Sequence, residues 1–189
     1  MRTPAPFAIL LLAACGTTEQ PAVEAGKISP PGTIERITQQ ELALTDTSVK
    51  IFDQRKALAL YGVYMEFADQ YPQDSMAPEY LFRAARMAKP LRKAAEAIAL
   101  CDRIITNYPQ WKVLPAIWMM KGITFQDELQ NKDSARKAYK GLIERLPETR
   151  YARDAKAMID NLQYTDEQLI EKFKAMNADT AQVAAGAGR

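Results

Sequence analysis

Two stretches decide the fold: residues 78–109, PEYLFRAARMAKPLRKAAEAIALCDRIITNYP, and residues 115–147, PAIWMMKGITFQDELQNKDSARKAYKGLIERLP. Each begins with a proline, which the first turn of a helix tolerates, and ends with a proline, which stops a helix. Between these prolines, apolar residues recur at helical spacing, and breaker or capping residues interrupt them near the middle. Each stretch therefore predicts a hairpin of two antiparallel helices.

The second helix of this hairpin occurs three times. The prolines that close it, Pro72, Pro109 and Pro147, are 37 and 38 residues apart. Three apolar residues precede each proline at the same offsets, which places them on one helical face. They are Leu60, Tyr64 and Phe67; Ala97, Cys101 and Ile104; and Ala135, Tyr139 and Leu142. The middle of the chain is therefore an internal repeat.

The first helices also match, because Leu81 corresponds to Trp118 and Ala85 to Gly122. This pattern resembles the tetratricopeptide repeat (TPR), in which the Ala/Gly position lets two helices approach closely. The resemblance covers roughly residues 57–163, with Lys121 standing where the family usually has Leu. The long period and the Tyr-Pro ends look like BamD-type outer-membrane lipoproteins and periplasmic cell-division coordinators. The resemblance to these repeat proteins implies an all-α solenoid of about three hairpins plus capping helices.

The flanking segments complete the expected domain plan. We predict a first hairpin over 34–44 and 49–70, with no strand, and a Ser75 cap before the helix that starts near Pro78. A last helix begins near Thr165, where Gln168 completes a capping box. Its apolar residues, expected to cover the final hairpin, are Leu169, Ile170, Phe173 and Met176. The expected divisions are a signal peptide (1–14), a flexible linker (15–33), the repeat domain (34–177) and a disordered tail (178–189).

Cys15 ends the run Leu12-Ala13-Ala14-Cys15, after a charged start at Arg2 and an apolar stretch. These features are typical of a secretory signal, and the stretch is far shorter than the ~20 residues of a spanning helix. The small-small-Cys ending also resembles the lipobox of bacterial lipoproteins, which implies cleavage before Cys15 and lipid on its thiol. An ordinary signal that happens to end in Cys is the alternative.

Composition argues against several functions. Histidine is absent, which removes the commonest general base and metal ligand. Once Cys15 carries lipid, Cys101 is the remaining cysteine, so we expect no intrachain disulfide and no metal site. The 25 basic and 23 acidic residues nearly balance, which gives no electrostatic case for nucleic acid. We expect no enzyme activity, cofactor or small-molecule substrate.

The first helices of TPR hairpins line a concave face, and the family register places six residues there as a partner-binding groove. They are Glu79, Phe82, Arg86, Met119, Ile123 and Gln126. This mixture suits a peptide or partner helix, although Phe82, Met119 and Ile123 are equally consistent with core packing. Trp118 is expected to be structural, whereas Trp111 either anchors a partner or covers a hairpin end. The basic run at Arg83, Arg86, Lys89, Arg92 and Lys93 is expected to be a solvated face, with a surface for anionic lipid or an acidic peptide as the alternative.

These features predict a non-enzymatic protein-interaction scaffold, lipid-anchored at Cys15 and held on the periplasmic side of the bacterial outer membrane. Gly16 after Cys15 is not the Asp that implies inner-membrane retention in enterobacterial lipoproteins. Its partners would be other envelope proteins, and the BamD resemblance implies a role in outer-membrane protein assembly. The alternatives are a subunit or regulator of a cell-wall or cell-division enzyme complex, and a self-assembling structural protein.

Overall fold

The computed structural model describes residues 29–44 and 53–186, and in this part of the chain the regular secondary structure is helical, without a strand. The helices are α1 (Thr33–Leu44), α2 (Gln54–Gln70), α3 (Ala77–Ala88), α4 (Ala94–Asn107), α5 (Leu114–Ile123), η1 (Thr124–Glu128), α6 (Lys132–Arg145), α7 (Arg150–Asn161) and α8 (Asp166–Gly186). η1 is a π-helical turn that continues α5. Cys15, the signal peptide and most of the linker lie outside the described residues.

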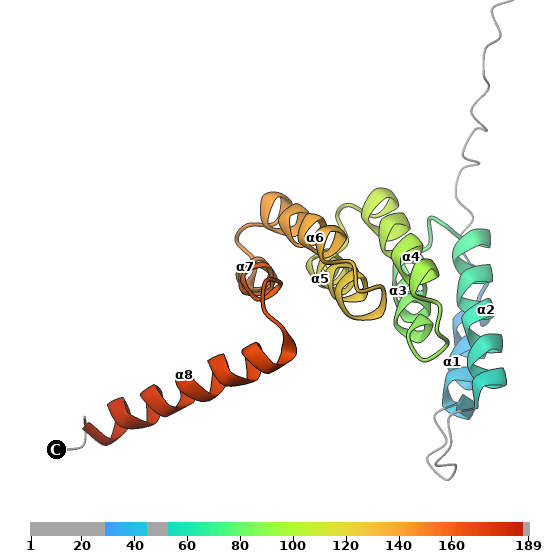
Figure 1. Cartoon of the computed structure of the whole chain (residues 1–189). Coiled ribbons are helices and arrows are strands. Elements are labelled where there is room, and N and C mark those ends of the chain that lie inside the picture. The colour runs from blue at the N-terminus through green and yellow to red at the C-terminus, as the bar shows by residue number, and fades with distance from the viewer. Residues whose placement is uncertain (1–28, 45–52, 187–189) are drawn as a thin grey trace, which may run out of the picture.

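Successive helices pack as antiparallel hairpins, which confirms the all-α TPR-type solenoid. The hairpins are α1–α2, α3–α4 and α5–α6, and α7 packs on α6. In Figure 1, α2, α4 and α6 form a front layer and α1, α3 and α5 a rear layer. The turns α2–α3, α4–α5 and α6–α7 therefore lie along one edge of the stack, which we call the turn edge.

The second helices end where the prolines require. α2, α4 and α6 stop at Gln70, Asn107 and Arg145, two residues before Pro72, Pro109 and Pro147. In each case the residue after the helix donates its backbone N–H to the carbonyl four residues earlier and leaves the helical conformation. This repeated stop places the turn to the next hairpin at the same point in each repeat.

The matched apolar triplets form the core, as predicted: all nine side chains are at most 4% exposed. The small residues mark the closest helix contacts. A Cβ on Gly122 would lie 2.2 Å from Tyr139 Cε1, and a Cβ on Gly141 would lie 2.7 Å from Trp118 Cζ3. Glycine at these two positions therefore sets how closely α5 and α6 approach.

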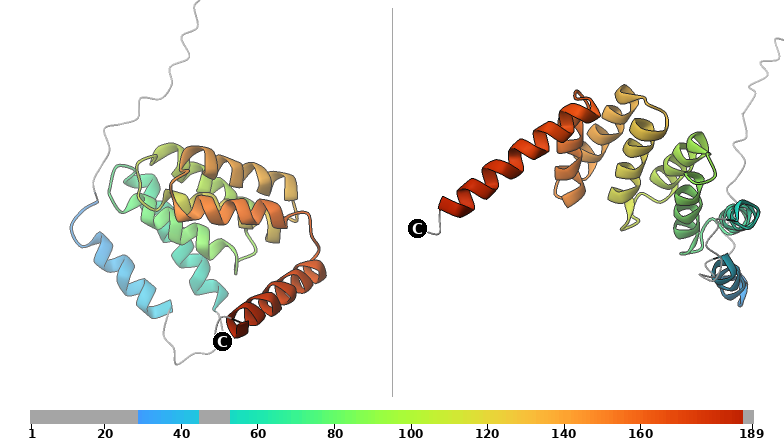
Figure 2. Two further views of the ribbon diagram at one scale, coloured as in Figure 1. Left: turned by 90° about the vertical axis from the view of Figure 1, so that its left-hand side faces the viewer. Right: turned by 60° about the horizontal axis from the view of Figure 1, so that its bottom comes forward.

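Two expectations for the C-terminal part are wrong. Helix α8 continues to Gly186, so residues 178–186 are helical rather than a disordered tail. The predicted capping box is present, because Thr165 and Gln168 exchange hydrogen bonds. However, α8 projects away from the stack (Figures 1 and 2). Ile170 and Phe173 remain 54% and 48% exposed, so they do not cover the final hairpin.

The start of α3 also differs from expectation. Ser75 does not cap the helix; the Asp74 carboxylate instead accepts a hydrogen bond from the backbone N–H of Met76. Asp74 is buried, 6% exposed, in the turn between α2 and α3. The last part of the predicted linker contacts this same side chain, because Ser29 hydrogen-bonds to Asp74. The ordered domain therefore begins before residue 34.

Candidate functional site

The candidate site is built on α3, α5 and η1, which carry the six residues of the predicted groove. Phe82 and Arg86 lie one turn apart on α3, and the Arg86 guanidinium carbon is 5.7 Å from the centre of the Phe82 ring. Trp111, in the turn before α5, makes an edge-to-face contact with the same ring, with 6.0 Å between ring centres. Two neighbouring hairpins therefore meet at an aromatic pair with a guanidinium beside it.

A cavity of about 200 Å³ lies between these hairpins and brings Arg86 and Ile123 together. Its walls are mainly small or apolar side chains: Ala85, Ala94, Ala97, Met120 and Ile123. Lys89 and Glu128, which also line the cavity, form an ion pair at 3.0 Å. Arg86 is exposed, and no carboxylate pairs with it in residues 29–44 and 53–186. The cavity thus combines apolar walls with a positive charge available to a ligand.

The other three predicted groove residues are engaged within the fold. Glu79 pairs with Arg83, whose Nε lies 2.8 Å from the carboxylate. Met119 is 8% exposed and belongs to the core. Gln126 accepts a hydrogen bond from the Tyr139 hydroxyl at 3.1 Å, and lines a separate cavity near the start of α8. The structure therefore brings Arg86 beside Phe82 and, across the cavity, near Ile123. Glu79, Met119 and Gln126 make their contacts within the fold instead.

Trp111 and Trp118 have different environments. Trp118 is 7% exposed and lies in the core against Gly141, as its TPR position predicts. Lys121 lies between the rings of Trp118 and Phe125 and pairs with Asp102 on α4. Its side chain is only 17% exposed, so a largely buried lysine stem stands where the family usually has Leu. Trp111 lies against Phe82, so the residue left undecided by sequence adjoins the groove.

Three of the five charges in the basic run, which lies on α3 and in the turn after it, are paired with carboxylates. Arg83, Lys89 and Lys93 pair with Glu41, Glu128 and Glu96 respectively. Burial acts to lower the pKa of Arg83, but its hydrogen bonds to Glu79 and Glu41 outweigh burial and raise it. Local ion pairs of this kind fit the expected solvated face rather than a binding surface for anionic lipid.

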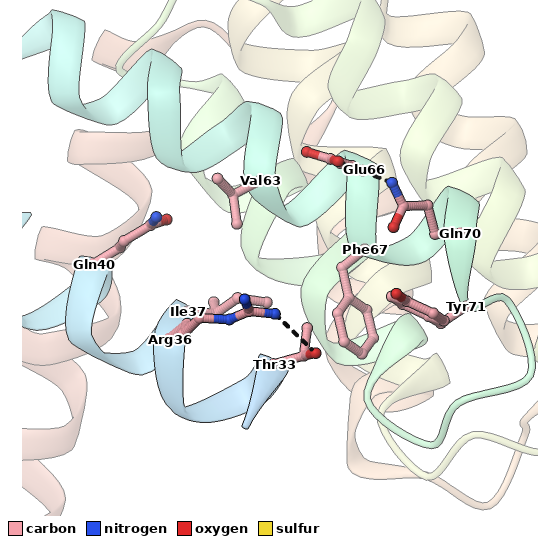
Figure 3. A pocket seen from close by; sticks show the side chains of 9 residues that line it. All are labelled: Thr33, Arg36, Ile37, Gln40, Val63, Glu66, Phe67, Gln70 and Tyr71. Atoms are coloured by element: carbon pink, nitrogen blue, oxygen red, sulfur yellow. Dashed lines mark hydrogen bonds between the residues drawn. The ribbon is translucent and has the colours of Figure 1, made fainter. Parts of the chain in front are cut away.

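A further cavity, of about 290 Å³, separates α1 from α2 (Figure 3). Ile37, Val63 and Phe67 form its apolar part, where side chains of the two helices face each other. The polar rim is partly satisfied within each helix: Arg36 donates to the Thr33 hydroxyl, and Gln70 donates to Glu66. Sequence reasoning missed this cavity because α1 fits the repeat poorly. Without an alignment to the repeat, the residues of α1 that face α2 could not be predicted.

The described residues contain no group of three or more His, Cys, Asp or Glu side chains that could hold a metal ion. Cys101 is fully buried, and burial raises the pKa of its thiol to about 12, so it is protonated at neutral pH. None of the described helices has the length and apolar character needed to cross a bilayer.

The stacked hairpins define a TPR-type protein, and the sequence assigns it to a family. Residues 63–172 match the family described as YfiO, outer membrane lipoprotein, and the chain belongs to this family. A solved structure of the first TPR of Spaghetti (RPAP3), bound to the HSP90 peptide SRMEEVD, shares 21% identity. That alignment covers 66% of this chain and 91% of the other, with a TM-score of 0.44. No curated protein matches the sequence.

Proposed function

We propose that this protein is a non-enzymatic scaffold of the bacterial envelope that binds a segment of another envelope protein between α3 and α5. The observation that carries the proposal is the position of Arg86. Its guanidinium stands beside Phe82 and an apolar cavity, without a carboxylate partner in the part of the chain that the structure describes. A partner segment with a carboxylate next to a small apolar side chain complements this arrangement.

The family supports a location at the outer membrane, and the Cys15 motif supplies the proposed means of attachment. Lipid on Cys15 would hold the domain on the periplasmic side and raise the local concentration of any bound partner. Replacing Cys15 with Ser removes the lipid acceptor. We expect the variant to lose labelling by a fatty-acid analogue and to leave the membrane fraction; retained labelling would contradict the lipid assignment.

The role we favour within the envelope is outer-membrane protein assembly. The groove assignment is tested by the double variant Phe82→Ala/Arg86→Ala, which removes both the ring and the charge. Because a few central residues carry most of the energy of an interface, we expect capture of the partner to weaken about tenfold or more. Helix content should be unchanged, since Arg86 is exposed and Phe82 only partly buried.

The control for this experiment is Lys140→Ala, which removes an exposed charge from α6 in the opposite layer. Recovery of a β-barrel assembly protein that is lost with the double variant, and retained with the control, would support the assembly role. Cell-wall enzymes recovered with the same dependence would instead favour a regulator of cell-wall synthesis or division. Capture that is equal for all three proteins would remove the groove assignment.

Self-assembly is the second candidate, and helix α8 favours it. Ile170, Phe173 and Met176 are each about half exposed along this helix. Exposed apolar side chains that gather on one helix are typical of association surfaces. Analytical ultracentrifugation over a concentration series tests this: a dimer lost on Phe173→Ala, but insensitive to Phe82→Ala, would support self-assembly.

A further inference from the structure

The buried carboxylate of Asp74 makes a contact that the repeat fold does not require. Asp74 Oδ2 accepts two hydrogen bonds from Ser29, one from the backbone N–H at 3.0 Å and one from the hydroxyl at 2.6 Å. The other oxygen, Oδ1, accepts from the backbone N–H of Met76 at 2.8 Å. One side chain therefore joins the start of α3 to a residue 45 positions earlier in the chain.

The three hydrogen bonds accepted by Asp74 are strong because their acceptor is charged and buried. A charged acceptor makes shorter and stronger hydrogen bonds than a neutral one, and the low exposure of Asp74 limits competition from water. Ser29 is held through both its backbone and its side chain, which fixes its position and its local backbone direction. The contact lies four residues before α1, so α1 does not need it to form.

We infer that Asp74 is a docking site for the chain's own linker, and that it fixes where this linker leaves the folded domain. Ser29 is the docked residue, and the exit point is the α2–α3 turn on the turn edge. Asp74 also borders a cavity lined by Tyr108 and Trp111 of the next turn. The exit therefore lies on the same side of the domain as Trp111, which packs against Phe82.

The consequence for orientation rests on the proposed lipid at Cys15. The chain from Cys15 to Ser29 reaches at most about 50 Å when fully extended. A linker that left freely from the start of α1 would let the domain turn in any direction. A linker docked at Asp74 instead attaches the domain by its turn edge, and it limits how far the face carrying Arg86 and Ile123 can lie from the bilayer.

Trypsin tests the docked linker directly, because Lys27 lies two residues before Ser29. A protease needs the residues that flank the cleaved bond in an extended and accessible form, and docking holds Ser29 on the domain. The full chain, purified in detergent, is digested briefly, and the peptide ending at Lys27 is quantified by mass spectrometry. We expect Asp74→Asn to raise the cleavage rate after Lys27 about tenfold or more over the unmodified protein.

Two further variants separate docking from a general loss of structure. Ser29→Ala removes the hydroxyl without touching the bond between Asp74 and Met76, and should raise the rate by a smaller factor. Ser75→Ala removes a neighbouring exposed hydroxyl and should leave the rate unchanged. Equal cleavage of the unmodified protein, Asp74→Asn and Ser29→Ala would overturn the inference. The readout requires neither lipid nor partner, so failure of the proposed function would not change it.

Discussion

At the scale of single residues, Gly122 is the clearest case of a position where packing requires glycine. The Tyr139 ring occupies the space that a Cβ would take, whereas Gly62, also within a helix, has nothing within 4 Å of its own Cβ position. We expect Gly122→Ala to lower the free energy of unfolding by about 1–3 kcal/mol through overpacking. Urea unfolding followed by circular dichroism measures the change.

The control is Gly62→Ala in α2, which is exposed. Alanine there should raise the free energy of unfolding by about 0.5–1 kcal/mol, because glycine is a poor helix former. If both substitutions raised the free energy of unfolding, helix propensity or the unfolded state, rather than the contact with Tyr139, would explain the data.

Asp74 gives a pH dependence of stability. Burial raises the pKa of this carboxyl, but hydrogen bonds from Ser29 and Met76 outweigh burial and hold it below the usual 3.8. A carboxyl with a lowered pKa in the folded state stabilises the fold above its unfolded pKa. This stabilisation is lost as the pH falls through the folded value.

We therefore expect the unmodified protein to exceed Asp74→Asn in free energy of unfolding by about 1–2 kcal/mol near neutral pH. The difference should shrink below about pH 4, as Asp74 takes up its proton. Urea titrations at neutral and acidic pH give both values. A difference that stays constant down to pH 2 would show that the Asp74 charge has no part in the effect.

Residue patterns predicted the core well and the site only in part. The triplets and Gly122 follow from helical spacing, because burial repeats with the period of the fold. The ion pair of Glu79 with Arg83 and the hydrogen bond of Gln126 with Tyr139 could not be predicted. The repeat pattern predicts which helix face a residue lies on, but not which side chains it contacts there. The bond between Ser29 and Asp74 has no periodic signal at all.

At the scale of helices, α1 is joined to the repeat by a polar cluster. Glu41 on α1 accepts hydrogen bonds from the Tyr64 hydroxyl of α2 at 2.8 Å and from Arg83 of α3 at 2.5 Å. Burial and the bond to Glu41 raise the pKa of Tyr64, so the hydroxyl remains a donor at neutral pH. The cluster links three helices, while a cavity separates much of α1 from α2.

Removing the Tyr64 hydroxyl should therefore loosen α1 selectively. We expect Tyr64→Phe to speed hydrogen exchange of the α1 amides about fivefold, equivalent to about 1 kcal/mol, and to leave α5 and α6 unchanged. Arg103→Met, which breaks the pair between α4 and Asp69 of α2, serves as the control and should not affect α1. Uniformly faster exchange in every helix would contradict this local role.

Helix boundaries were predicted where proline or capping residues fixed them, at the ends of α2, α4 and α6 and at Thr165. The C-terminal part was harder. Small residues after 177 suggested disorder, yet alanine is a strong helix former, and α8 continues to Gly186. Amphipathic spacing in α8 predicted an apolar face packed on the final hairpin, yet Ile170 and Phe173 remain about half exposed.

At the scale of the whole molecule, the hairpins place Arg86, Phe82 and Ile123 on neighbouring repeats of one stack. The family membership places such a stack among outer membrane lipoproteins. The proposal joins these facts: a domain attached at its turn edge offers a charged and apolar groove to another envelope protein. A solenoid suits this role because each hairpin adds surface without chemistry of its own.

The most direct test is photo-crosslinking in intact cells from a reactive amino acid placed at residue 123, with one at Lys140 of the opposite layer as the comparison. The account predicts a discrete crosslink to an envelope protein from residue 123, absent from residue 140 and weakened by Arg86→Ala. Identical products from both positions, or none that depends on Arg86, would contradict binding at the groove.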